Sequence, residues 1–193
     1  MTKWFVLPAL ACLVFASCAT SEKNSITRLS KEQRLTQPPT GKTLVNFHRV
    51  TSYGGIERYP IFTIDGRFVC DLPGHAGFQY ICNSGEQVFI GWADQVSVVK
   101  VELAPNKVYD VMVDVGMGWM HPNIKLLPMA KTDPRRAKLS EFETRENLVT
   151  FTPNQRVIEY EARQQQRVAD IKRDFLSGEK AERVRILSKD DCR

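Results

Sequence analysis

VSVVKVELAPNKVYDVMVDV, residues 96–115, is the stretch that decides the fold class of this chain. Apolar residues occupy alternate positions of 96–103 and again of 107–115, with charged residues between them. A period of two is typical of half-buried antiparallel strands. Ala104-Pro105-Asn106 supplies a turn between the two runs. We therefore predict two successive β-strands, in which Lys100 and Glu102, and then Asp110 and Asp114, lie on the face opposite the apolar residues.

Outward from this stretch, similar short runs extend over residues 43–129 and are separated by turn residues. Asp65-Gly66 lies between two apolar runs of 59–72 and predicts a hairpin with a type I′ turn, in which both central residues have positive φ. The other runs are 45–50, 78–83, 87–92 and 124–127. Because no helix-length segment intervenes, we predict an all-β fold, an antiparallel β-sandwich of about seven or eight strands.

Two cysteines lie on neighbouring predicted strands. A three-residue turn at His75-Ala76-Gly77 would place Cys70 opposite Cys82, and we hypothesise a disulfide bond there. The alternative is two buried free thiols, which a loop at 73–76 would separate. Cys192, near the C-terminus, is predicted to be a free thiol.

The C-terminal part has a different pattern. Residues 130–153 are polar and irregular, and we interpret them as a linker. Apolar residues then recur at helical spacing over 155–176, after a start signal at Thr152-Pro153-Asn154 and before a stop signal at Gly178. Residues 154–193 are therefore predicted to form an α-helical extension, with a second short helix over 179–187.

The N-terminus is typical of an exported bacterial protein. Lys3 precedes thirteen uncharged residues, Trp4 to Ala16, which suit a signal peptide and are too short to span a bilayer. Ala16-Ser17-Cys18 resembles a lipobox, so residues 1–17 are interpreted as a lipoprotein signal peptide and Cys18 as the lipidated residue. The rival interpretation is ordinary cleavage after Ala19. Residues 18–42 would then form a polar tether, and we predict the periplasmic face of the outer membrane.

Charge and histidine spacing do not indicate a catalytic or metal site. The net charge is +5, and loss of Lys3 would leave +4, spread along the chain, so we predict no nucleic-acid partner. His48, His75 and His121 lack the spacing of metal ligands and are interpreted as surface residues. We predict no catalytic residue, no metal and no cofactor.

One loop is unusual in composition. Residues 116–122 hold two glycines, two methionines and a tryptophan, and Met117, Trp119 and Met120 could form a hydrophobic contact patch. The alternative is a loop that packs Trp119 into the end of the sandwich.

The stretch from Lys42 to about Leu126 resembles a family of small bacterial lipoproteins known as domain of unknown function 2846. The likeness lies in LVNFHR at 44–49, IDG at 64–66, LPG at 72–74, NSGE at 83–86 and LAPNKVY at 103–109. The resemblance implies a lipobox, a linker and an immunoglobulin-like β-sandwich, and it implies no catalytic residues.

Three hypotheses on function follow, in order of preference. The first is a lipid-anchored, non-enzymatic interaction or structural module whose partner is another envelope protein. The second is a binder of an envelope glycan or lipid, with a pocket lined by Tyr53, Trp92 or Trp119. The third is an envelope hydrolase with a histidine beside a cysteine or serine nucleophile.

Overall fold

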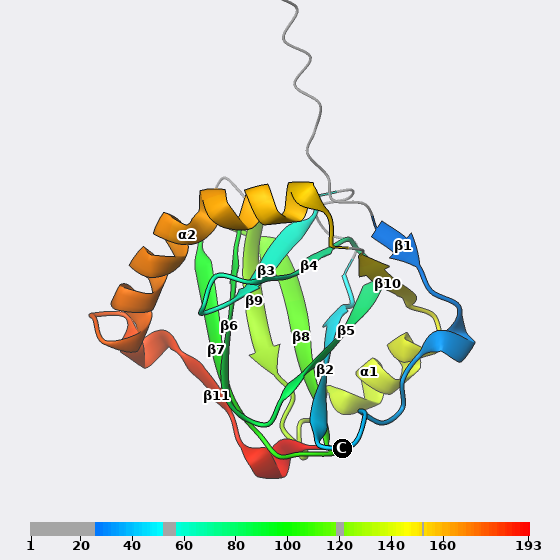
Figure 1. Ribbon diagram of the computed structural model, residues 1–193. Coiled ribbons are helices and arrows are strands. Elements are labelled where there is room, and N and C mark those ends of the chain that lie inside the picture. The colour runs from blue at the N-terminus through cyan, green and yellow to red at the C-terminus, as the bar shows by residue number, and fades with distance from the viewer. Residues whose placement is uncertain (1–25, 52–56, 119–121, 152) are drawn as a thin grey trace, which may run out of the picture.

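The computed structural model describes residues 26–51, 57–118, 122–151 and 153–193. In this part of the chain, two mixed β-sheets pack as a sandwich-like fold (Figure 1). The strands are β1 (Ile26–Arg28), β2 (Lys42–Arg49), β3 (Tyr59–Thr63), β4 (Phe68–Leu72), β5 (Ala76–Asn83), β6 (Gly85–Trp92), β7 (Val96–Leu103), β8 (Val108–Met117), β9 (Pro122–Pro128), β10 (Asn147–Phe151) and β11 (Arg185–Leu187). The helices are α1 (Arg136–Glu143) and α2 (Gln155–Leu176), with 3-10 turns η1 (Lys31–Gln33), η2 (Ala181–Arg183) and η3 (Lys189–Asp191).

The two sheets differ in strand order. Sheet A has six strands in the order β1-β10-β5-β2-β8-β9, and sheet B has five in the order β11-β7-β6-β3-β4. The pairs β2–β8, β5–β10 and β7–β11 are parallel. The prediction of a sandwich is confirmed at this coarse level, but the prediction of antiparallel sheets is wrong. The short turn after Leu103 carries the chain from sheet B to sheet A, so β7 and β8 do not pair with each other, and β8 instead lies parallel to β2.

The core lies between the two sheets. The alternation predicted over 96–115 is confirmed for the apolar residues of one face, which are buried in the core between the sheets, whereas Val98 and Met112 pack in clusters on the outer faces. Phe47 of β2 and Phe89 of β6 meet edge to face across this core, with ring centroids 5.1 Å apart. The inward residues of β7 and β8 are Val99, Val101, Leu103, Tyr109, Val111, Val113 and Val115.

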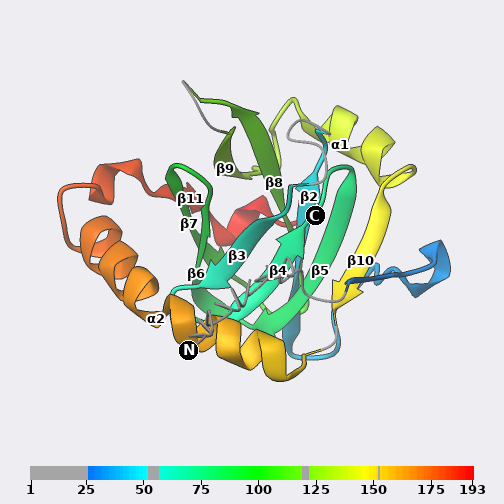
Figure 2. The same ribbon diagram turned by 90° about the horizontal axis from the view of Figure 1, so that it is seen from above.

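Further layers cover the outer faces of both sheets. Figure 2 shows α2 on one side of the sandwich and α1 on the other. Apolar residues of α2, among them Val168 and Phe175, pack on the outer face of sheet B around Phe62 and Trp92. The helix α1 contributes Leu139 and Phe142 to a small apolar cluster with Met129. Of the residues described, no helix combines the length and the apolar character needed to cross a membrane.

The segments predicted as linker, tether and helical extension all contain strands that pair with the two sheets. The expected linker, 130–153, contains α1 and β10, and β10 pairs with β5 of sheet A. The expected tether, 18–42, contains β1, which pairs with β10. The second helix expected over 179–187 is instead the turn η2 followed by β11. These short segments have weak patterns of their own and take their structure from the sheet edges they meet.

The predicted helix at 155–176 is confirmed, together with its start. The Asn154 side chain accepts a hydrogen bond from the Val157 backbone N–H, which satisfies one of the free donors of the first turn. The helix ends at Leu176, just before Gly178. A Cβ at Gly178 would lie 2.9 Å from the carbonyl oxygens of Arg173 and Asp174, so the chain needs glycine to leave the helix here.

The hairpin at Asp65-Gly66 forms, but with a different turn. Gly66 has φ +83°, and among the described residues only His75 and Asn106 are non-glycines with positive φ. Asp65 therefore does not take the conformation that a type I′ turn requires. The Thr63 N–H donates to the Arg67 carbonyl at 2.8 Å, which closes a three-residue loop with glycine in the left-handed position.

Candidate functional site

Charged side chains gather on the outer face of sheet A, under α1 and the two ends of the described chain. His48 comes from β2 and Asp110 from β8, whereas Glu143 ends α1 and Glu146 follows it. Three arginines complete the set, which we call the ion cluster. It consists of His48, Asp110, Glu143, Glu146, Arg34, Arg136 and Arg193.

His48 lies at the centre of the ion cluster and is 1% exposed. Its Nδ1 is 3.0 Å from Glu146 Oε2, and its Nε2 is 3.1 Å from Asp110 Oδ1. Only the imidazolium form can donate a hydrogen bond from both ring nitrogens. Burial by itself would lower the pKa of His48, but the hydrogen bonds to Asp110 and Glu146 outweigh burial, and the pKa is raised. The ring therefore lies between two carboxylates in a position that favours its protonated form.

Asp110 is fully buried and accepts hydrogen bonds from several directions. Its oxygens are 3.0 Å from Asn46 Nδ2, 3.0 Å from Arg136 Nη1 and 2.5 Å from Arg193 Nε. Burial would raise the pKa of this carboxyl, but hydrogen bonds from His48 and Arg193 bring it well below its usual range. Asp110 therefore ties β8 to β2, to α1 and to the last residue of the chain.

The position of Glu146 depends on a glycine in β5. A Cβ added to Gly77 would lie 2.5 Å from Glu146 Oε2, closer than any real contact. The carboxylate therefore lies directly over the backbone of β5, where it meets His48 and the guanidinium of Arg34. Burial would raise the pKa of Glu146, but the hydrogen bond and charge of His48 and the contact with Arg34 lower it. Gly77 is thus needed for close approach rather than for a left-handed turn.

His48, Glu143 and Glu146 have the donor types of a metal site, with one ligand atom from each lying within 4.8 Å of the others. Imidazole and carboxylate ligands suit zinc and similar ions. However, Arg34 binds Glu146 and Arg193 binds Glu143. Within the described ion cluster, three carboxylates face three guanidinium groups, so a divalent ion would have to displace a guanidinium. The donor set therefore fits an internal ion-pair network better than a metal centre.

The ion cluster predicts a specific pH dependence of stability. His48 has a raised pKa, so its contribution to the free energy of unfolding is fully present below its ordinary pKa of 6.5. This contribution is lost as the pH rises through the pKa of the folded state. Asp110 and Glu146 have lowered pKa values, so they stabilise the folded state above their ordinary pKa values of 3.8 and 4.5. This stabilisation is lost as the pH falls through their folded pKa values. We expect the unfolding free-energy difference between the wild type and His48→Gln to be largest near pH 5–6 and to shrink towards pH 9.

Chemical denaturation at several pH values measures this difference. His75→Asn, which removes an exposed histidine and keeps a residue type that tolerates positive φ, is the matched control and should change stability little at any pH. A difference for His48→Gln that stays constant or grows up to pH 9 would mean that His48 is neutral in the folded protein.

The structure corrects the predicted positions of the histidines and cysteines. His48 is buried rather than on the surface, because α1 and the chain ends cover its strand, whereas His75 is exposed as predicted. His121 lies outside the described residues. Cys70 in β4 pairs with Ile61 of sheet B, and Cys82 in β5 pairs with Thr43 of sheet A.

The predicted hairpin between these two cysteine strands is therefore wrong, and both thiols are free in this structure. His75 has φ +53° and turns the chain towards the other sheet, so Gly77 joins β5 instead of forming a hairpin turn. Burial raises the pKa of the Cys70 thiol well above its ordinary value and that of Cys82 to about 11, which keeps both protonated at neutral pH.

The predicted contact patch is described only in part. Met117 ends β8 and is 71% exposed. Trp119 and Met120 lie outside the described residues, as do Cys18 and Tyr53. Trp92, expected in an open pocket, is 6% exposed because it stacks on Phe62 at 4.8 Å and Arg167 of α2 lies over its ring. Within the described residues, the Trp92 ring is therefore covered rather than open to a ligand.

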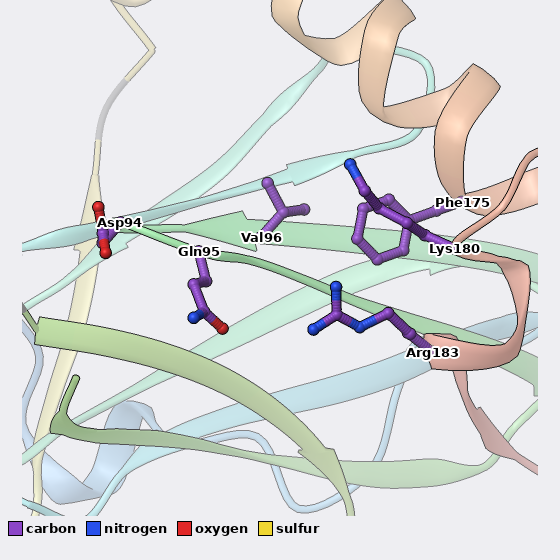
Figure 3. A pocket seen from close by; sticks show the side chains of 6 residues that line it. All are labelled: Asp94, Gln95, Val96, Phe175, Lys180 and Arg183. Carbon is purple, nitrogen blue, oxygen red and sulfur yellow. The ribbon is translucent and has the colours of Figure 1, made fainter. Parts of the chain in front are cut away.

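A hollow of about 310 Å³ lies between the β6–β7 turn and the segment that follows α2 (Figure 3). Asp94, Gln95 and Val96 line it from the turn, and Phe175, Lys180 and Arg183 from the opposite side. Lys180 Nζ is 2.9 Å from Asp174, and it also lies 5.7 Å from the centre of the Phe175 ring. The hollow is thus lined mainly by polar and charged groups, of which Lys180 is already paired, and Phe175 contributes little exposed surface.

Arg49 is a second buried charge that the sequence pattern did not reveal. Its side chain is fully buried, donates from Nη1 to the carbonyl oxygens of Glu57 at 2.6 Å and Leu72 at 2.9 Å, and lies over the Tyr59 ring. Burial lowers its pKa. These contacts link the end of β2 to β3 and β4, and so join the two sheets.

One signal in the sequence could have indicated the ion cluster. Asn46 and His48 alternate with apolar residues in β2, and Asp110 does the same in β8, so all three share the outer face. The parallel register places Asn46 beside Asp110, but this pairing joins residues that are 64 positions apart. Periodicity shows which face a residue lies on and does not show whether another segment covers that face.

The fold and the ion cluster define a sandwich-like β-protein with two mixed sheets and a buried ion-pair network. Comparisons of the chain with family models, with curated proteins and with solved structures found no match. The resemblance to domain of unknown function 2846 therefore stays a prediction.

Proposed function

We propose that this protein is a lipid-anchored module of the bacterial cell envelope that acts by non-enzymatic contact with another envelope protein. Cys18 carries the lipid, and the domain faces the periplasm from the outer membrane. The resemblance to domain of unknown function 2846 and the lipobox-like Ala16-Ser17-Cys18 support this proposal.

The observation that carries the proposal is that the charged groups of the ion cluster form hydrogen bonds and ion pairs with one another. His48 and Asp110 are buried, and their hydrogen-bonding atoms are directed at other members of the ion cluster. A hollow of about 210 Å³, lined in part by Arg136, Glu143 and Arg193, borders the ion cluster, but a catalytic group needs an atom free to reach a substrate, and both ring nitrogens of His48 are occupied. This arrangement instead joins β2, β8, α1 and both ends of the described chain into one unit, which is what a structural module requires.

Intact mass of the membrane fraction tests the anchor. We expect residues 18–193 with a lipid-sized mass increment, and we expect Cys18→Ser to lose both the increment and the membrane association. Ala16→Ser, which keeps a small residue before the cysteine, is a control that should leave lipidation intact. A wild-type product in the soluble fraction beginning at Thr20 would overturn the anchor.

The contact surface is tested separately from the anchor. Met117 is the described member of the patch and is 71% exposed, so Met117→Ser should weaken recovery of a specific envelope partner while stability stays within about 0.5 kcal/mol of the wild type. Trp119→Ala should act in the same direction. Ile186→Ser, at an equally exposed residue on β11, is the control. Equal recovery by all of these variants would place the contact elsewhere.

The hollow beside Phe175 supports a second candidate function, the binding of an envelope lipid or glycan that carries negative charge. Arg183 offers a guanidinium that reaches into the hollow (Figure 3), whereas Phe175 is 4% exposed and lies at its edge, and Asp94 is the one acidic residue of the described lining. Vesicles with anionic headgroups should then bind the wild type more strongly than Arg183→Gln. Equal binding would remove this candidate.

A further inference from the structure

The segment 26–41, which we call the strap, is attached to the molecule without burying any of its residues. Each of its residues is exposed or intermediate in exposure, including those of β1 and η1. Burial of apolar surface is the main source of stability in a folded chain, and segments with little of it open locally at low cost. Ile26 packs, partly buried, against the core between the sheets, and the rest of the strap depends on polar contacts.

Those polar contacts run along one side of β10 and β5. β1 pairs antiparallel with β10, and the Leu29 N–H donates to the Leu148 carbonyl at 2.8 Å. Further along, the Leu35 N–H donates to Gln79 Oε1 at 2.8 Å, and Gln79 Nε2 donates back to the Leu35 carbonyl at 2.9 Å. Water can replace each of these exposed bonds, so they position the strap but add little net stability.

Arg34 is the exception, because it reaches the ion cluster. Its guanidinium binds the carboxylate of Glu146, whose side chain is 0% exposed, and lies 3.6 Å from Glu143. When Arg34 leaves, Glu146 loses its guanidinium partner while still buried over Gly77. A charge-assisted bond to a buried group is stronger than the exposed bonds around it. Arg34 is thus the residue on which docking of the strap depends.

We propose that the strap docks and undocks as a unit, with the Arg34–Glu146 pair as its lock, and that this sets the reach of the domain from the membrane. The effect on reach rests on the proposed lipid anchor at Cys18. With the strap docked, seven residues lie between Cys18 and Ile26, and this length of chain spans at most about 29 Å when fully extended. With the strap released, the free chain extends to Lys42 and spans at most about 86 Å. Pro38 and Pro39 stiffen the part that would be freed.

Hydrogen exchange of the full chain, followed by mass spectrometry, tests the docking. We expect Arg34→Gln to speed exchange in peptides covering residues 26–35 at least tenfold, while peptides from β8 keep their wild-type rate. Arg34→Lys keeps the charge but loses the planar guanidinium, so it should give an intermediate rate. Arg28→Gln, which removes an exposed arginine of the same segment, is the matched control and should exchange at the wild-type rate.

Two results would overturn the proposal. Exchange over 26–35 within twofold of wild type in Arg34→Gln would show that the backbone bonds alone hold the strap. Equal acceleration in β8 would show that Arg34 supports the whole fold rather than the strap. The same measurement on Cys18→Ser separates docking from anchoring, because loss of the lipid should leave the protection of 26–35 unchanged.

Discussion

We expect Asp110→Ala to lower the free energy of unfolding by about 3–5 kcal/mol, which is the usual cost of removing one partner from a buried ion pair. The Asp110 side chain is 0% exposed and accepts hydrogen bonds from His48, Arg136 and Arg193. Its removal leaves the guanidinium of Arg136, on α1, and the protonated ring of His48 without their shared carboxylate. Urea denaturation near pH 6, where the ion cluster is complete, measures this loss.

Asp114→Ala is the matched control for this prediction. Asp114 lies four residues further along β8 on the same face but is only partly buried, and its strand neighbour in β9 is Lys125. We expect this substitution to change stability by less than about 1 kcal/mol. Equal losses in the two variants would show that removing any aspartate from β8 has this cost, and the argument for a buried network would fail.

The second large effect is expected at Phe62, in the layer between sheet B and α2. Phe62 is 0% exposed, stacks on Trp92 at 4.8 Å, and meets Phe68 at 5.4 Å and Tyr160 of α2 at 5.6 Å. Phe62→Ala removes these ring contacts and leaves a cavity beneath the helix. We expect a loss of about 3–5 kcal/mol in the free energy of unfolding.

Thermal and chemical unfolding followed by circular dichroism measure this loss. Ile158→Ala, on the exposed side of α2, removes a similar kind of side chain from the surface and should cost less than about 0.5 kcal/mol. A loss below about 1 kcal/mol for Phe62→Ala would mean that α2 does not cover sheet B in solution. In that case the C-terminal helix would be an extension that does not pack on the sandwich.

Some of the molecule could be predicted from local patterns alone. The strands with clear alternation, 96–103 and 107–115, have their apolar residues buried as expected. The helix at 155–176 has the predicted bounds because its signals, Asn154 at the start and a stripe of apolar residues, act within a few turns. The helix signals depend on contacts between residues that are close in the sequence. The strand pattern depends only on whether each face of the strand is covered by the core or by solvent.

The pairing of strands could not be predicted in this way. The hairpin expected between Cys70 and Cys82 assumed that successive strands are neighbours, whereas His75 turns the chain from sheet B to sheet A. Likewise, β1, β10 and β11 have three to five residues each and lie in segments with no clear period. A short edge strand is stabilised mainly by the strand it meets, and that partner is distant in the sequence.

The ion cluster illustrates the same limit in chemical terms. The alternation of residues determined that His48 and Asp110 lie on the outer face of sheet A. Only the tertiary structure decided that this face is buried, because Arg34, α1 and Arg193 come from positions 14 to 145 residues away from His48 and cover it. A polar residue on a strand face has the same pattern whether water or a guanidinium lies above it. The sequence by itself therefore determined the faces of the strands and one long helix. Long-range packing decided which charged residues are buried and paired with one another.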